Sequence, residues 1–256
     1  MRVSPVIVAA FILSVAVPAS AQDWIDFMSK EDRFTANFPG QPAVRNTTYK
    51  SQFGADLPAR EYTASLGLSR FTLTVVDYRP IEKILAARVQ ACPEGFEVCR
   101  GGFGSTGPGY SWADRAGAMI YATWNFMNRD GVKITEFSWN NINQVVGQYL
   151  HLTNPDKSRT YVGIFMHDDF LYISEGTVPA GYPEPGLFQQ GLAFLDSNGN
   201  SIRYDSHYVN GQPVPTYNGG QVRTDPGAGG ARYGGPRGGG GGRGGRGGGR
   251  GAQQPQ

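Results

Sequence analysis

Histidine and carboxylate side chains stand together at His167-Asp168-Asp169, where an imidazole is followed by two acids. Such a group can bind a metal ion or move protons near neutral pH. The two aspartates also suit an ordinary two-residue turn, which predicts His167 at a strand end, beside Gln144 on the preceding strand and Phe170 on the next. That register leaves His151 several residues distant, so we do not expect a shared metal site.

Glu175 is the one candidate for a catalytic acid. The same register places it opposite Val162, on a face of the predicted sheet that also carries Ile164, Met166 and Ile173. A carboxylate on an apolar face has a raised pKa and can donate a proton in catalysis, although exposure at the sheet edge is the favoured interpretation. No serine or cysteine has a visible activating base, so the sequence favours a binding module over an enzyme.

Two loops resemble ligand-binding motifs. Residues 102–107 have the G-x-G-x-x-G spacing of phosphate-binding turns, but a buried parallel strand does not precede them, which favours a plain flexible loop. Residues 196–200 begin like a calcium loop, yet Ser201 replaces the glycine at position six and His207 the glutamate at position twelve. A helix end followed by an Asn-Gly turn is favoured, and the sequence predicts neither a metal nor a cofactor.

The N-terminus has the pattern of a secretory signal peptide. Arg2 precedes an apolar run from Val6 to Val17, and Ala19 and Ala21 occupy the small-residue positions of a cleavage site. The run is shorter than the roughly 20 residues that span a bilayer, and no other stretch is apolar for long enough, so we expect no transmembrane span. These features predict cleavage after Ala21 and a periplasmic or secreted protein.

Two cysteines, Cys92 and Cys99, bracket a short segment of the chain. In an oxidising compartment this pair is expected to form a disulfide. A metal site would need further ligands, and the three histidines lie far away in sequence.

The C-terminal segment 214–256 is rich in glycine and basic. It holds six arginines against Asp225, a net charge of +5, whereas the whole chain has a net charge of +2. Such a segment is expected to be disordered and to contact anionic lipid, acidic polysaccharide or nucleic acid weakly. A solvated spacer without a fixed partner is the open alternative. The arginines expected to contact polyanions are Arg232, Arg237, Arg243, Arg246 and Arg250.

Hydrophobic periodicity predicts mostly strands in the remaining chain. They are expected near Trp24–Phe27, Phe34–Phe38, Ala59–Leu66, Arg70–Tyr78, Val132–Trp139, Val145–Thr153, Arg159–Met166, Phe170–Val178 and Ile202–Tyr208. Short helical patterns follow Pro80 and Pro185, the second running through Leu187 to Leu195.

Residues 112–129 have two interpretations. As a helix, the segment is capped by Ser111 and Asp114 and presents one apolar face. Alternatively, Asp130-Gly131 is the turn of a hairpin, because the preceding residues include many aromatic side chains. The apolar face of the helix consists of Ala113, Ala116, Ile120, Trp124 and Met127.

Strands grouped before and after two helices indicate an α+β fold, in which an antiparallel sheet of meander and hairpins packs against about three helices. The predicted organisation is a signal peptide at 1–21, a single globular domain at 22–213 and the disordered tail at 214–256.

The segment Asp32–Pro42 carries an F-x-x-x-F-P hairpin, and Tyr182–Gln190 reads YPEPGLFQQ. Through both stretches the chain resembles a family of uncharacterised exported bacterial proteins, which implies no known activity. The first motif is also distantly similar to PsbP-like sandwich proteins. That resemblance implies an antiparallel sheet between helices and an accessory or partner-binding role.

Together these features predict an exported binding or accessory module for an unknown protein or small-molecule ligand. Two other functions stay open: a periplasmic hydrolase or isomerase that uses an acid such as Glu175 in a cleft, and nucleic-acid binding through the tail.

Overall fold

The computed structural model describes residues 24–95, 100–101, 106–209 and 222–224. The predicted signal peptide, Cys99, most of the glycine motif and the tail arginines other than Arg223 lie outside these residues. None of the helices in the described ranges is long and apolar enough to cross a membrane.

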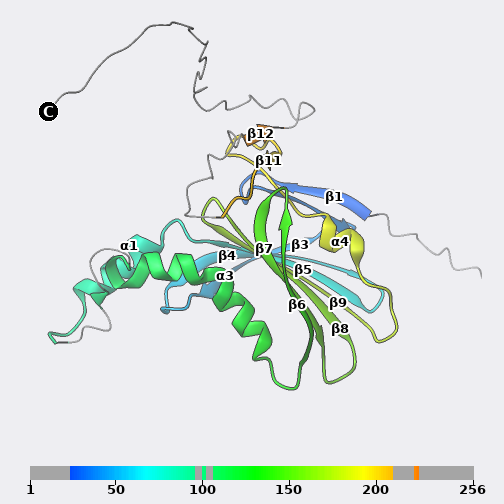
Figure 1. The fold of residues 1–256 in the computed structure, drawn as a ribbon, viewed down its shortest axis with the longest axis horizontal. Coiled ribbons are helices and arrows are strands. Elements are labelled where there is room, and N and C mark those ends of the chain that lie inside the picture. The colour runs from blue at the N-terminus through cyan, green and yellow to red at the C-terminus, as the bar shows by residue number, and fades with distance from the viewer. Residues whose placement is uncertain (1–23, 96–99, 102–105, 210–221, 225–256) are drawn as a thin grey trace, which may run out of the picture.

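A seven-stranded antiparallel sheet forms the centre of the fold (Figure 1). Its strand order is β3-β4-β5-β9-β8-β7-β6, so β3 and β6 are the two edges. The strands are β3 (Ala43–Lys50), β4 (Asp56–Leu66), β5 (Ser69–Asp77), β6 (Lys133–Ile142), β7 (Val145–Thr153), β8 (Arg159–His167) and β9 (Phe170–Val178). The antiparallel α+β fold predicted from the sequence is confirmed.

The helices α1 (Ile81–Gln90) and α3 (Ser111–Met127) pack on one face of this sheet, with the 3-10 turn η1 (Pro108–Tyr110) between them. Residues 112–127 are therefore helical, and the segment 112–129 does not form a hairpin. The predicted buried face of this helix is wrong, since Ile120 and Trp124 are 63% and 57% exposed. Ala118, Ala122 and Phe126 are buried against the sheet instead. The two alanines let the helix approach the sheet closely.

The predicted helix cap is also wrong. Tyr110, in a left-handed conformation, precedes the helix, and no side chain caps its first turn. Asp114 instead accepts hydrogen bonds from the Ser51 hydroxyl and the Phe53 N–H in the loop between β3 and β4. Its full burial raises the pKa of this carboxyl. The acid thus joins the helix to the sheet rather than ending the helix.

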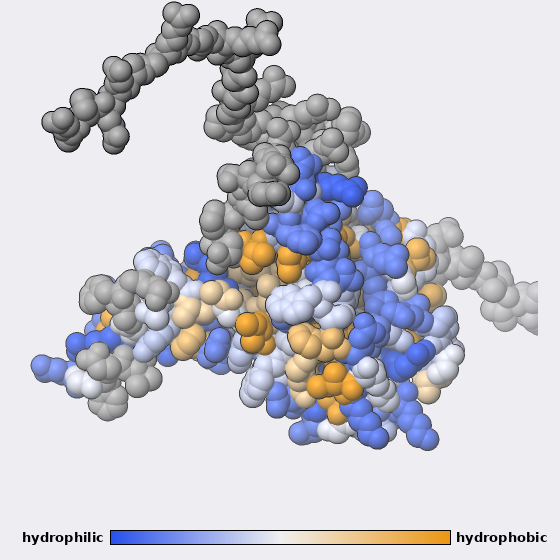
Figure 2. All heavy atoms as spheres, in the orientation of Figure 1, coloured by the Kyte–Doolittle hydropathy of each residue, from blue (hydrophilic) through white to orange (hydrophobic). Residues whose placement is uncertain are grey.

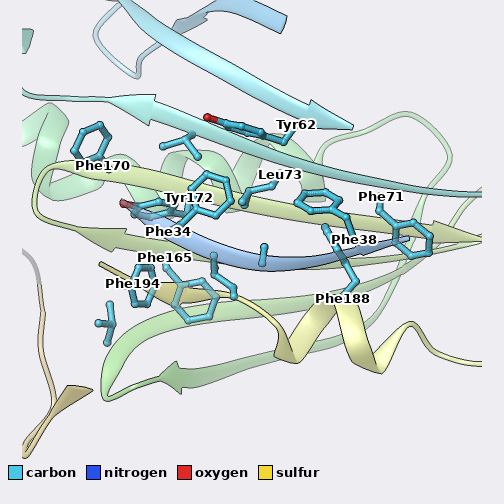
Figure 3. Close-up of a cluster of buried hydrophobic side chains, with 14 of the residues drawn as sticks. Phe34, Phe38, Tyr62, Phe71, Leu73, Phe165, Phe170, Tyr172, Phe188 and Phe194 are labelled. Atoms are coloured by element: carbon cyan, nitrogen blue, oxygen red, sulfur yellow. The ribbon is translucent and has the colours of Figure 1, made fainter. Parts of the chain in front are cut away.

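A small three-stranded sheet and a short helix cover the other face of the large sheet. They are β1 (Trp24–Ser29), β2 (Phe34–Pro39), β10 (Ala193–Phe194) and α4 (Gly186–Gln190). The layer between them is largely aromatic (Figure 3), with Phe34, Phe165, Tyr172 and Phe194 buried together. Burial of such rings supplies much of the hydrophobic stabilisation of a domain.

The third predicted helix, through Leu187 to Leu195, is too long. α4 ends at Gln190, and Ala193–Phe194 pairs with β2 as a strand. Gly191 marks the change, because a Cβ there would lie 2.7 Å from the Asn37 Cβ and from the Leu187 carbonyl oxygen. This close approach of two backbone segments excludes a larger side chain.

The C-terminal part of the described chain forms β11 (Ile202–Tyr204), which pairs with β12 (Val222–Thr224). The last predicted strand is therefore shorter than expected, and Tyr208 forms a separate parallel bridge to Val145. β12 lies inside the segment 214–256 that the sequence assigns to a disordered tail.

The hairpin register around His167 differs by one residue from the prediction. His167 pairs with Phe170 as expected. Thr153 pairs with Arg159, so the preceding turn includes Ser158, and continuing the register places His167 opposite Val145 rather than Gln144. Asn154 bonds to both the carbonyl and the hydroxyl of Ser158, which explains the extra turn residue.

Candidate functional site

A polar cleft of about 210 Å³ opens between the β6–β7 edge of the large sheet and the segment that leads into α4. Its walls carry carboxylates, amides, hydroxyls and one imidazole, which could bind a ligand by hydrogen bonds and charge. The lining residues are Glu136, Ser138 and Asn140 of β6, Tyr149 and His151 of β7, and Glu184, Gln189 and Gln190. These stretches are distant in sequence, so only the folded chain brings them together.

The pleat of β6 and β7 directs polar side chains into the cleft. Glu136 pairs with His151, and Ser138 pairs with Tyr149. Directly paired residues lie on the same face of a sheet, which gathers these four side chains on one side. A register shift between Ile134 and Glu136 marks a bulge, which sets Glu136 opposite the histidine.

The other wall is held against the sheet by contacts to backbone carbonyls. The Tyr149 hydroxyl donates to the Gln189 carbonyl at 3.4 Å, and the Arg159 guanidinium donates to the Tyr182 carbonyl. Prolines on both sides of Glu184 restrict its backbone further. Glu184 therefore approaches the sheet from a constrained segment.

His151 lies between two carboxylates in this cleft. Its Nδ1 is 3.0 Å from Glu136 Oε2, and its Nε2 is 3.5 Å from Glu184 Oε1. The ring packs edge-on against Tyr161, with centroids 4.7 Å apart. The histidine side chain is 22% exposed and each carboxylate 50%, so both acids are open to solvent and the imidazole between them is mostly covered.

The hydrogen-bond pattern suits binding better than nucleophilic catalysis. Ser138 Oγ donates to Glu136 Oε1 at 3.2 Å, so the serine bonds to the acid and not to the imidazole. In a nucleophilic triad the serine donates its hydrogen bond to the imidazole, which takes up the proton, and the carboxylate contacts only the imidazole. The two half-exposed carboxylates instead form an acceptor-rich site that attracts a cationic donor such as an amine or guanidinium.

A larger cavity of about 330 Å³ lies at the other end of the sheet, near the turn between β1 and β2. Its charges are already paired with one another. Arg60 Nε donates to Asp32 at 2.8 Å, and Arg79 holds Asp77 through two hydrogen bonds of 2.8 Å. The Arg79 guanidinium also lies 4.5 Å from the Phe170 ring centroid. Because both arginines are already ion-paired with aspartates of the cavity, little unpaired charge is left to bind a ligand.

Asp32 is the centre of this second network and is only 3% exposed. It accepts hydrogen bonds from Arg60 and from the Tyr62 hydroxyl. Burial and the bond to Asp32 raise the pKa of Tyr62, while the Arg60 hydrogen bond lowers the pKa of Glu31. The network fastens the β1–β2 turn to β4.

His167 is fully buried rather than placed in a site. Its Nε2 lies 2.9 Å from the Tyr204 hydroxyl, and its ring stacks on Phe194. Burial lowers the pKa of this imidazole to about 4. Asp168 turns away to pair with Arg33, so the three adjacent polar residues do not form one centre.

Glu175 pairs with Val162 on the helix-covered face, as the register predicts. Both of its oxygens accept hydrogen bonds from the Arg129 guanidinium, at 2.7 and 3.0 Å. A carboxylate held this way is an ion pair beside the end of α3, and it lies on the opposite face of the sheet from the polar cleft.

The other predicted site residues fall into two groups. Asp196 accepts hydrogen bonds from the Asn198 and Asn200 N–H groups, so this loop is an ordinary Asx turn. Cys99 and the tail arginines Arg232, Arg237, Arg243, Arg246 and Arg250 lie outside the described residues. The disulfide with Cys92 and the polyanion contacts therefore stay predictions.

No group of three or more His, Cys, Asp or Glu side chains within the described ranges is placed to hold a metal ion. Comparison with known proteins finds no protein-family model and no curated sequence that matches the chain.

Sequence reasoning did not identify the Glu136–His151–Glu184 group. One signal was present, since polar and apolar residues alternate from Glu136 to Asn140 in the way of a strand with two different faces. The contribution of Glu184 depends on how a loop folds back over the sheet, which sequence spacing does not encode.

Proposed function

We propose that this chain is an exported binding or accessory module that holds its ligand in the polar cleft. The observation that carries the proposal is the Glu136–His151–Glu184 group, in which one imidazole lies between two half-exposed carboxylates from different elements. A site assembled from a strand pair and a constrained segment is pre-organised, which reduces the entropy lost on binding.

The chemistry of the cleft favours a ligand with a cationic group. Two carboxylates at its mouth attract positive charge, while the amides of Asn140 and Gln190 offer both donors and acceptors. An amine or guanidinium that carries neighbouring amide groups, as in a basic peptide, meets both requirements.

The basic tail completes the proposed module. Outside the cytoplasm, an arginine-rich segment of net charge +5 is attracted to anionic lipid, acidic polysaccharide or free nucleic acid. We propose that the tail keeps the folded body near such surfaces, while the cleft provides the specific contact.

Nuclear magnetic resonance of the ¹⁵N-labelled protein tests the cleft directly. L-argininamide is added as a cationic probe, with N-acetylglucosamine and citrate as neutral and anionic comparisons. We expect L-argininamide alone to shift the backbone amides of Glu136, His151, Glu184 and Gln189. Equal shifts with citrate, or shifts confined to another part of the fold, would contradict the proposal.

A further inference from the structure

The two edges of the large sheet differ in how they face solvent. β3 carries ion pairs along its edge, Arg45 with Glu61 and Lys50 with Asp56. Charged side chains of this kind discourage another strand from pairing with an edge. β6 instead exposes Ile134 and Phe137 by 46% and Trp139 by 60%. The sheet thus protects one edge and leaves the other suited to pairing.

The hydrophobic side chains of β6 gather on the same side of the sheet as α3. Phe137 pairs with Leu150 and Ile134 with Leu152, and both leucines belong to the helix-side core. In Figure 2, hydrophobic residues lie over β6 and over α3 on the face toward the viewer. Glu136, Ser138 and Asn140 point to the opposite face, into the polar cleft.

Backbone groups of β6 point outward at alternate residues. The Val146 N–H donates to the Tyr208 carbonyl, away from β6, so the pair of Val146 with Asn141 is not hydrogen-bonded. Bonded and non-bonded pairs alternate in an antiparallel ladder. The pairs of Phe137 with Leu150 and of Trp139 with Gln148 are therefore also not hydrogen-bonded. The backbone N–H and C=O groups of Phe137 and Trp139 point away from β7, to the outer edge of the sheet.

One outward donor is already occupied. The Asn141 N–H donates to the Asn140 side-chain oxygen at 2.7 Å, which closes this end of the edge. The bulge before Glu136 interrupts the ladder at the other end. Among the described residues, the unblocked part of the edge is thus centred on Phe137 and Trp139, whose outward N–H and C=O groups allow four backbone hydrogen bonds to an added strand.

We propose that β6 receives an extended segment of a partner protein as an added antiparallel strand, and that this segment alternates apolar with basic residues. Its apolar side chains lie beside Phe137 and Trp139, and its basic side chains lie beside Glu136 at the mouth of the polar cleft. The inference rests on the proposed function, because it makes that cleft the part of the site that recognises charge.

Charge complementarity selects this occupant. A strand added at β6 places every second side chain on the face that carries Glu136, and one of these side chains lies directly beside this half-exposed carboxylate, with Glu184 on the facing wall. Opposite charges at neighbouring cross-strand positions stabilise a sheet, and like charges destabilise it. An acidic or purely apolar segment lacks this contact, whereas lysine or arginine at alternate positions provides it.

A fluorescein-labelled peptide of five Val-Lys repeats, titrated by fluorescence anisotropy into the mature chain, tests strand addition. Valine residues opposite Phe137 and Trp139 would direct their N–H groups toward β6, and the lysines would direct theirs away. Methylation of the backbone nitrogens of the valines should weaken binding at least tenfold. Methylation of the backbone nitrogens of the lysines, which leaves their side-chain amines unchanged, should weaken it less than threefold. Replacing the lysines with glutamates should abolish binding.

Two variants at one position give a matched control in the protein. Trp139→Pro removes an outward N–H without breaking the pairing of β6 with β7, whereas Trp139→Thr removes the same indole but keeps the N–H. We expect at least tenfold weaker binding for Trp139→Pro than for Trp139→Thr. Circular dichroism melting of both variants checks the fold, and the N-methylated peptides test the same hydrogen bonds in the unaltered protein.

Equal effects of the two N-methylation patterns would overturn strand addition. A dimer of the unaltered protein in sedimentation that becomes monomeric in Trp139→Pro would also overturn it, because a second copy would then occupy the edge. If L-argininamide still shifts the cleft amides in either case, the proposed function stands and only this inference fails. If L-argininamide shifts nothing while the peptide binds through its valine N–H groups, the cleft fails instead.

Discussion

Replacing His167 with glutamine should remove a large part of the acid sensitivity of the fold. The imidazole is fully buried beneath Phe194 and Tyr204, and its Nε2 lies 2.9 Å from the Tyr204 hydroxyl. Burial is the main cause of a pKa lowered from 6.5 to about 4; the nearby Arg33 acts in the same direction and Asp168 in the opposite one. Glutamine offers a similar hydrogen bond and takes up no proton.

The size of the effect follows from the two pKa values. Well above pH 6.5 the imidazole is neutral in both the folded and the unfolded chain, so its burial does not lower the free energy of unfolding by excluding a proton. As the pH falls from 6.5 toward 4, the unfolded chain binds a proton that the folded protein excludes, and stability decreases. The pKa difference corresponds to a decrease of about 3 kcal/mol in the free energy of unfolding at low pH, of which about 2 kcal/mol is already lost at pH 5.

Urea denaturation at pH 7.5 and pH 5.0 measures this loss for the unaltered protein and for His167→Gln. Carboxylates titrate in both proteins, so the difference between the two losses isolates the histidine. We expect the unaltered protein to lose about 2 kcal/mol more than the variant over this interval. Equal losses would refute the assignment of a neutral, solvent-excluded imidazole.

Three further predictions concern other parts of the chain. Asp32→Ala leaves Arg60 without its main partner and should lower the free energy of unfolding by about 3 kcal/mol in urea denaturation; a loss under 1 kcal/mol would contradict a structural role for this carboxylate. Ending the chain after Thr224 keeps β12 and removes five arginines, so it should abolish retention on heparin at low salt without changing the melting temperature. Equal retention of both forms would place the polyanion contact in the folded body. Cys92 and Cys99 should resist a thiol reagent in folded protein until a reductant is added, and immediate labelling of both would show that no disulfide is present.

Strands with one clearly apolar face could be predicted from the sequence. β7, β8 and β9 alternate strongly or are apolar throughout, and their predicted bounds agree closely with the structure. β3 was missed because it is an edge strand whose side chains are mostly exposed. Its sequence therefore carries no hydrophobic alternation to detect.

The orientation of α3 shows a second limit. Sequence periodicity locates a helix, but it favours the larger apolar residues as the buried face. In the structure Ala118 and Ala122 approach the sheet, and Thr123 is buried because it donates a hydrogen bond to Gln148. A polar side chain with a partner from a distant strand can lie inside, and the sequence does not reveal that partner.

The candidate site was hidden for the same reason. His151 was predicted correctly to lie apart from His167, yet its two carboxylate neighbours come from another strand and from a loop. One of them, Glu184, reaches the cleft only because the segment before α4 folds back over β7 and β8.

A nuclear magnetic resonance titration with L-argininamide measures whether the two carboxylates of the cleft bind a cationic ligand. The double variant Glu136→Gln/Glu184→Gln removes both charges and keeps side chains of the same shape, and Glu82→Gln on α1 serves as a control away from the cleft. We predict that the double variant binds at least tenfold more weakly while Glu82→Gln binds as the unaltered protein does. Equal affinity of all three proteins would contradict the claim that this acidic cleft is the binding site.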